Sequence, residues 1–275
     1  MESATLHTMA RRYLMSRTDK LHAEAARAPK MPSLNGAHPG YTEEEKRIFP
    51  RFHVVNAMLS AVERLDPEDL PPLSQVASTL SIAASTAQSI FTTDRDPIAT
   101  EAGAAERELF RRAIKGWLVS SDVDVEPLPY RRVFSDEEAA GWRRGLERRW
   151  GVHQTLWHPL ISEDVPEDVL VLDSLAMWDG GGIELVREAL AALGVRRVTE
   201  IREFGDPGAR LDLELLVPTY DGAEGYWTDD TLDWLVYASH EQSVAFGGTL
   251  AERLRTSWPN LADWAYVPPW GQPAK

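Results

Sequence analysis

Hydrophobic residues recur at helical spacing through the first part of the chain. A periodic run over residues 6–28 predicts one helix, and a second begins near Thr42 and ends before Pro67. Residues 73–93 and 97–117 continue the helical period. Several helices of this kind, joined by short polar segments, predict a helical bundle.

The uncharged segment 73–93 raises the question of a membrane span. Eleven of its 21 residues are Ser, Thr or Gln, and these are costly to place in hydrocarbon. We therefore expect no membrane span and a packed helix at the bundle centre. In the helix that follows, we expect Leu109, Ala113 and Trp117 to share the buried face.

Beyond residue 130 the hydrophobic runs become shorter and strand-like. Strands are predicted at residues 130–134, 152–157, 168–173, 195–204, 210–216, 234–239 and 243–247. Helices are predicted at 135–150, 183–193 and 250–257, the first opened by a capping box of Ser135 and Glu138. The apolar run 168–173 suits a central strand, and 195–204 with 210–216 suits a hairpin. The predicted fold class is α+β, with a mainly antiparallel sheet and packed helices after the bundle.

Charge changes near the same place as the hydrophobic pattern. The chain has 29 Lys+Arg and 43 Asp+Glu, a net charge of −14. Residues 1–121 contain 15 Lys+Arg and 15 Asp+Glu, which cancel. Residues 122–275 contain 14 Lys+Arg and 28 Asp+Glu, so the C-terminal half carries the whole net charge of −14. Nine of the ten tryptophans also follow Ser121. These changes predict a helical bundle over 1–121, a linker at 122–129 and an acidic domain over 130–275.

Amino-acid composition limits the classes of binding partner and the cellular compartment that we expect. An acidic surface repels phosphate backbones, so nucleic-acid binding by the C-terminal half is not expected. A basic protein partner, a cation or simple solubility are compatible with the charge. The chain has no cysteine, and residues 1–5 lack the basic start and apolar core of a signal peptide. We expect a cytoplasmic location.

One segment concentrates aromatic and acidic side chains. Residues 220–227 contain Tyr220, Asp221, Glu224, Tyr226 and Trp227. An aromatic–acidic recognition loop and a plain structural turn are both compatible with this pattern. The residues from Thr228 onward are expected to form a capped short helix.

Ser239-His240-Glu241 places a histidine beside a carboxylate, which suggests acid–base chemistry. If the strand at 234–239 continues, adjacent side chains point to opposite faces and the three cannot form a triad with one another. Structural polar groups at a strand end and a functional pocket both remain open.

Two further patterns are interpreted as structural. Gly180-Gly181-Gly182 precedes a helix, but Asp179 and Glu184 would repel a phosphate there. His153 and His158 would face opposite ways on a strand and are not expected to bind a metal.

The chain contains no nucleophile elbow, dinucleotide fingerprint, phosphate-binding lysine loop or paired-histidine zinc helix. The sequence therefore assigns no catalytic residue, no cofactor and no metal. Segments 49–55 and 233–241 resemble segments of uncharacterised bacterial proteins with a helical N-terminal half and an α+β C-terminal half. That resemblance implies no activity and no residue role.

The leading hypothesis is a cytoplasmic interaction protein, of an immunity- or antitoxin-like kind, that binds a basic protein through its acidic, aromatic-rich C-terminal half. The binding candidates are Tyr220, Asp221, Glu224, Tyr226, Trp227, Ser239, His240 and Glu241. One alternative is an enzyme of unknown reaction with a His/carboxylate site in that half. Another is a helical scaffold or dimerisation module. The sequence leaves the oligomeric state open.

Overall fold

The computed structural model describes residues 1–28, 42–89, 92, 96–120, 124–153, 158–159, 169–203 and 208–268. Most of the strand predicted at 152–157 lies outside these residues. The chain divides into two compact units, Met1–Leu128 and Pro129–Lys275. The first contains helices and the second a sheet with helices, so the predicted α+β class is confirmed.

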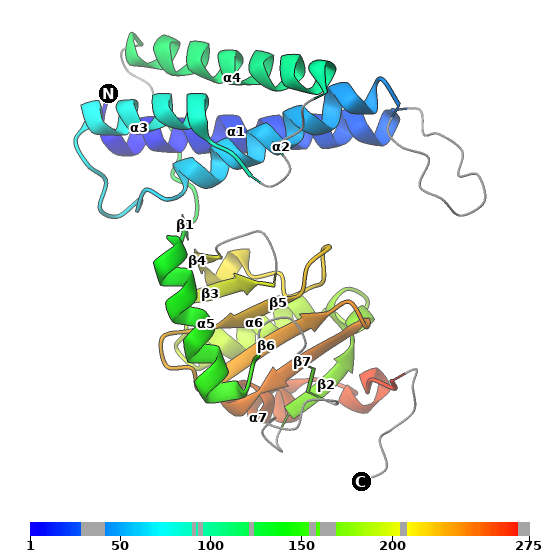
Figure 1. The fold of residues 1–275 in the computed structure, drawn as a ribbon. Coiled ribbons are helices and arrows are strands. Elements are labelled where there is room, and N and C mark those ends of the chain that lie inside the picture. The colour runs from blue at the N-terminus through cyan, green and yellow to red at the C-terminus, as the bar shows by residue number, and fades with distance from the viewer. Residues whose placement is uncertain are drawn as a thin grey trace. The chain divides into compact units, whose positions relative to one another are not determined.

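The first unit contains four α-helices in its described residues (Figure 1). They are α1 (Ser3–Arg27), α2 (Glu45–Val62), α3 (Leu73–Thr86) and α4 (Pro97–Leu118). Their apolar sides meet in one core, where Leu14, Met58, Leu80 and Phe110 are fully buried. The unit is therefore a helical bundle with a single hydrophobic core.

Local polar residues fix where two of these helices begin. Before α2, the Glu45 N–H donates to Thr42 Oγ1 at 3.1 Å, and the Thr42 N–H donates to the Glu45 carboxylate at 2.8 Å. Before α4, the Asp96 carboxylate accepts the Ile98 N–H at 2.8 Å. Caps of this kind satisfy N–H groups that have no partner within the helix.

The expectation that the uncharged helix lies at the bundle centre is wrong. One side of α3 faces solvent, and Ile82 on that side is 58% exposed. The hydroxyls of Ser81, Ser85 and Thr86 donate to carbonyls four residues earlier, so the exposed side is polar without being charged. Among the described residues, no helix is long and apolar enough to cross a membrane.

The buried face of α4 also differs from the expected one. Phe110 and Ile114 are buried, whereas Leu109 is exposed. The face is therefore rotated by one residue from the predicted one. A charged residue, Glu106, lies within this buried face, and that charge conceals the helical period from a count of apolar positions alone.

The second unit contains one seven-stranded sheet, with strand order β1-β4-β3-β5-β6-β7-β2. Its strands are β1 (Arg131–Val133), β2 (Val169–Asp173), β3 (Arg197–Arg202), β4 (Ala209–Asp212), β5 (Gly225–Thr228), β6 (Trp234–Ser239) and β7 (Ser243–Gly247). Every pair in the described residues is antiparallel. This confirms the predicted antiparallel sheet.

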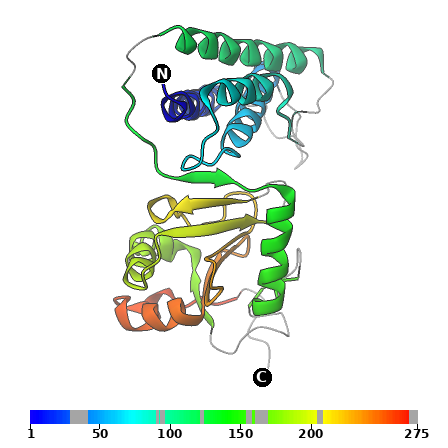
Figure 2. The same cartoon turned by 90° about the vertical axis from the view of Figure 1, so that its left-hand side faces the viewer.

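Helices cover both faces of the sheet (Figure 2). Helix α5 (Asp136–Trp150) packs on one face, while α6 (Gly182–Ala192) and α7 (Gly248–Ser257) pack on the other. Neighbouring strand residues divide between the two cores: Tyr226 belongs to the α5 side and Trp227 to the α6–α7 side. The capping box of Ser135 and Glu138 opens α5 as predicted.

Two strand predictions need correction. The hairpin is confirmed as β3 and β4, but β4 ends at Asp212 and a 3₁₀ turn, η3 (Leu213–Leu215), follows it. Strand β2 lies at the sheet edge and not at its centre. Its run is apolar because alternate residues pack on each core: Leu172 on one side, Val171 on the other. Burial on two faces therefore does not identify a central strand.

Candidate functional site

The turn between β6 and β7 brings together Ser239, His240 and Glu241, which the sequence pattern places on opposite faces of a continued strand. After Ser239 the chain leaves the strand, and Gln242 has a positive φ of 59°. Ser239 Oγ accepts the Glu241 N–H at 3.1 Å. The alternating arrangement expected for Ser239, His240 and Glu241 is therefore wrong, because the segment is a turn and not a continued strand.

A buried carboxylate orients the exposed imidazole in this turn. His240 Nδ1 lies 2.6 Å from Glu224 Oε1, and Ser239 Oγ donates to the same oxygen at 3.2 Å. The Glu224 side chain is 5% exposed and that of His240 is 60% exposed. His240 Nε2 lies 3.2 Å from Glu241 Oε1, so a carboxylate flanks each ring nitrogen. The hydrogen bond that the His240 ring donates to Glu224 raises the pKa of His240 above its ordinary value.

Glu224→Gln is expected to lower the pKa of His240, because an amide replaces the charged acceptor. A titration followed by NMR of the histidine ring protons measures the change. Since the pKa of His240 is raised in the folded state, its contribution to stability is complete below about pH 6.5 and lost as pH rises through the folded pKa. Glu147→Gln, beside His153, is the matched control. An unchanged His240 pKa in Glu224→Gln would contradict the assignment.

Tyr220 and Asp221 lie beside this turn. The Tyr220 ring centroid is 6.3 Å from that of His240. Asp221 accepts two hydrogen bonds from the Arg202 guanidinium, both at 3.0 Å. Arg202 also donates to Glu200 at 2.7 Å. Of the eight predicted site residues, six therefore lie at one end of the sheet: Tyr220, Asp221, Glu224, Ser239, His240 and Glu241.

The other two predicted residues, Tyr226 and Trp227, are buried in the two cores and do not belong to this exposed group. They belong to β5, between β3 and β6, and both are buried. Gly225 allows this arrangement, since a Cβ there would lie 2.3 Å from the Trp227 indole. Thr228 does not begin a helix, because its hydroxyl donates to the Trp234 carbonyl at 2.6 Å at the end of the strand pair.

Sequence reasoning missed two exposed apolar residues at the same end of the sheet. Leu175 lies in the 3₁₀ turn η2 (Ser174–Met177), and Trp178 follows it. Trp178 is 61% exposed, and Leu175 is exposed as well. The Ser174 N–H donates to the Gln242 carbonyl at 2.9 Å, which attaches η2 to the β6–β7 turn. No sequence signal separates these exposed residues from the buried Met177 between them.

We define the sheet-end surface as Leu175, Trp178, Tyr220, Asp221, His240 and Glu241. Carboxylates outnumber cations in and around it: Asp173, Asp179, Asp221, Glu224 and Glu241 against Arg202 and His240. Among the described residues, no group of three or more His, Asp or Glu side chains could hold a metal ion. The surface therefore combines exposed aromatic rings with net negative charge.

The remaining candidates are structural in the described residues. Gly181 has a φ of +64°, and a Cβ on Gly182 would lie 2.4 Å from Met177, so the conformation and packing of the turn account for glycine at these two positions. His153 lies 3.4 Å from Glu147, whereas the buried His158 contacts Ser243 Oγ at 3.2 Å. The two histidines thus bond to different elements.

The chain matches no family model, and no curated protein or solved structure is significantly similar to it.

Proposed function

We propose that the protein is a cytoplasmic interaction protein whose C-terminal unit binds a basic segment of another protein through the sheet-end surface. The observation that carries the proposal is the exposed Trp178, which follows the η2 turn that a Ser174–Gln242 hydrogen bond attaches to the β6–β7 turn with its Glu241 carboxylate. Exposed aromatic side chains act as anchors in protein interfaces, and charged surroundings give specificity. Leu175 and Tyr220 extend the apolar part of the surface.

The charge of the C-terminal half supports a basic partner. Its net charge of −14 attracts Lys- and Arg-rich surfaces over a distance of about 10 Å at moderate salt. Glu224 is buried beneath this surface and acts on it indirectly, by fixing the position of His240. The immunity-like form of the proposal is the case in which the basic partner is a toxin.

Trp178→Ala is expected to weaken capture of the partner by about tenfold or more, as for an interface anchor. The immobilised full chain is incubated with a lysate of its native host at low and at moderate salt, and bound proteins are quantified by mass spectrometry. Wild type and the control Glu188→Gln, an exposed carboxylate on α6, should recover the same stoichiometric basic protein. The proposal fails if no such protein is recovered at either salt, or if Trp178→Ala recovers as much as wild type.

The Glu224–His240 pair favours a second candidate function, an enzyme with a His/carboxylate site. A buried carboxylate that orients an imidazole is the arrangement of many general bases. Here the second ring nitrogen also contacts Glu241, so catalysis requires that contact to open. Turnover of chromogenic carboxylic and phosphate esters by wild type, lost in His240→Gln, would support this candidate. Equal background rates in the two proteins would reject it.

A further inference from the structure

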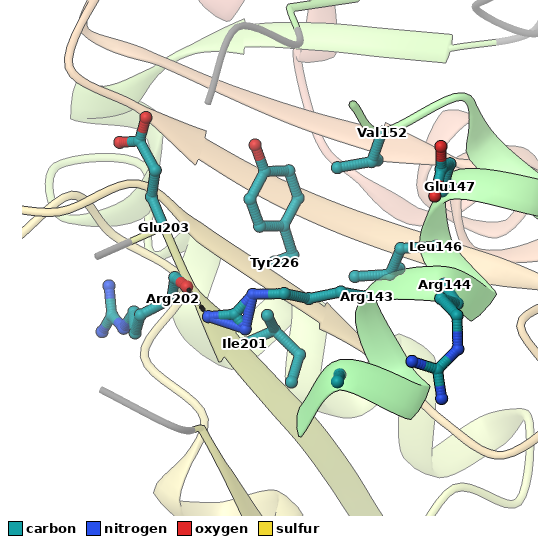
Figure 3. Close-up of a pocket in the computed structure, with 10 residues that line it drawn as sticks. Arg143, Arg144, Leu146, Glu147, Val152, Ile201, Arg202, Glu203 and Tyr226 are labelled. Carbon is teal, nitrogen blue, oxygen red and sulfur yellow. Dashed lines mark hydrogen bonds between the residues drawn. The ribbon is translucent and has the colours of Figure 1, made fainter. Parts of the chain in front are cut away.

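A pocket lies between α5 and the sheet, and none of its described lining residues belongs to the sheet-end surface (Figure 3). Its volume is about 430 Å³, within the range of roughly 300–1,000 Å³ for small-molecule sites. The described residues that line it are Ala140, Arg143, Arg144, Leu146, Glu147, Val152, Ile201, Arg202, Glu203 and Tyr226. The space is large enough for a ligand of amino-acid size.

Part of the lining is apolar. Leu146 comes from α5, Val152 from the residues after it, and Ile201 from β3, and all three are buried. Tyr226 adds an aromatic ring from β5, and its hydroxyl points in the same direction as the Glu203 carboxylate in Figure 3. Burial raises the pKa of Tyr226, so its phenol stays neutral at physiological pH.

Two of the five charged residues in the described lining of the pocket already have an ionic partner, and a third extends into solvent. The Arg202 guanidinium pairs with Glu200 and Asp221 and points away from the pocket, so Arg202 lines it through its backbone. Glu147 lies 3.4 Å from His153. The Arg144 guanidinium is exposed and extends away from Arg143 (Figure 3). These groups do not require a ligand.

Arg143 and Glu203 differ from the other charged groups. Arg143 donates to the Arg202 carbonyl at 2.8 Å, yet within the described part of the chain it forms no ion pair. In that same part the Glu203 carboxylate forms no ion pair, and the backbone of Glu224 interacts with it. Both residues are half-buried, and hydrogen bonds to neutral groups replace only part of the solvation that a charge loses when no opposite charge is near. Burial, and then the nearby Glu224 charge, raise the pKa of Glu203, while His240 and the Glu224 backbone oppose part of this rise.

We propose that this pocket binds a zwitterionic α-amino acid with an apolar side chain. The ligand carboxylate accepts hydrogen bonds from Arg143, its ammonium donates to Glu203, and its side chain packs on Leu146, Val152 and Ile201. One bipolar ligand thereby neutralises two opposite charges that do not reach each other. The inference does not rest on the proposed partner binding, which uses other side chains.

The first experiment is isothermal titration of the full chain with L-phenylalanine and three analogues. 3-Phenylpropionate lacks the ammonium, phenethylamine lacks the carboxylate, and glycine lacks the apolar side chain. L-Phenylalanine should bind, and each analogue should bind about tenfold more weakly, because each loses a charge-assisted hydrogen bond or the apolar contact. Equal binding of 3-phenylpropionate or phenethylamine would overturn the proposal in favour of a simple anion or cation site. No binding of L-phenylalanine at millimolar concentration would overturn it too.

The second experiment uses variants of the two unpaired charges. Arg143→Gln and Glu203→Gln should each weaken L-phenylalanine binding by about tenfold. Arg148→Gln, on the same helix but outside the pocket, and Glu188→Gln should bind as wild type does. If Arg143→Gln does not fold, the analogue series on wild type decides alone. Trp178→Ala should bind L-phenylalanine normally, which separates failure of this site from failure of the sheet-end surface.

Discussion

Trp227→Ala is expected to lower the free energy of unfolding of the C-terminal unit by about 4 kcal/mol. The indole is 1% exposed and belongs to the core on the α6–α7 side of the sheet. Arg202 stacks over its ring at 5.0 Å, and Gly225 lies against its edge. Truncation therefore leaves a large cavity in a central strand and removes a cation–π contact.

The measurement is urea unfolding of the full chain, with hydrogen exchange of β5 and β6 amides to report on this unit. Trp178→Ala is the matched control, since it removes the same side chain from a position that is 61% exposed. It should change stability by no more than about 0.5 kcal/mol. Similar losses in the two variants would mean that Trp227 is not a core residue.

Features that depend on neighbouring residues could be predicted from the sequence. Ser135 and Glu138 satisfy each other's backbone N–H groups within one turn, so the capping box needs no distant partner. The strands at 234–239 and 243–247 were also identified with the bounds of β6 and β7. Their apolar runs, residues 234–238 and 244–246, are unbroken and close together in the chain, which makes the pattern informative.

Strand β5 shows why other features could not be predicted. Only four residues, Gly225–Thr228, form it, and a glycine and carboxylates precede them. Its strand conformation comes from pairing on both sides. Gly225 lies opposite Arg202 of β3 on one side and opposite Ala238 of β6 on the other. Such pairing is non-local, and local propensity gives little sign of it.

Predicting the candidate site from the sequence would also have required predicting β5. Glu224 immediately precedes β5 and His240 immediately follows β6. The register of these two strands therefore places the carboxylate beside the imidazole, although 16 residues separate them in sequence. Without β5, the eight-residue segment reads as a loop, and its buried aromatic residues are assigned to the same surface as its exposed ones.

Glu106→Ala is expected to destabilise the N-terminal bundle by about 3 kcal/mol. The carboxylate is 1% exposed and holds two guanidinium groups: Arg17 at 2.5 and 3.0 Å, and Arg51 at 3.1 Å. Removing it leaves two partly buried cations facing each other, with only the partly exposed Glu24 carboxylate, 3.3 Å from Arg51, as a counter-charge. Glu108→Ala, on the same helix at a half-exposed position, should cost at most about 1 kcal/mol. Far-UV circular dichroism in urea, with hydrogen exchange of α4 amides, measures both.

A triple replacement tests whether the stability loss in Glu106→Ala comes from uncompensated charge or from lost side-chain volume. If uncompensated charge causes the loss, Arg17→Met, Arg51→Met and Glu106→Leu together should recover most of it, because a buried ionic network and an apolar cluster of similar volume differ little in stability. The urea midpoint of the triple variant should then lie near that of wild type and above that of Glu106→Ala. A triple variant as unstable as the single one would show that Glu106 stabilises the bundle through its packing and geometry, and that its charge contributes little.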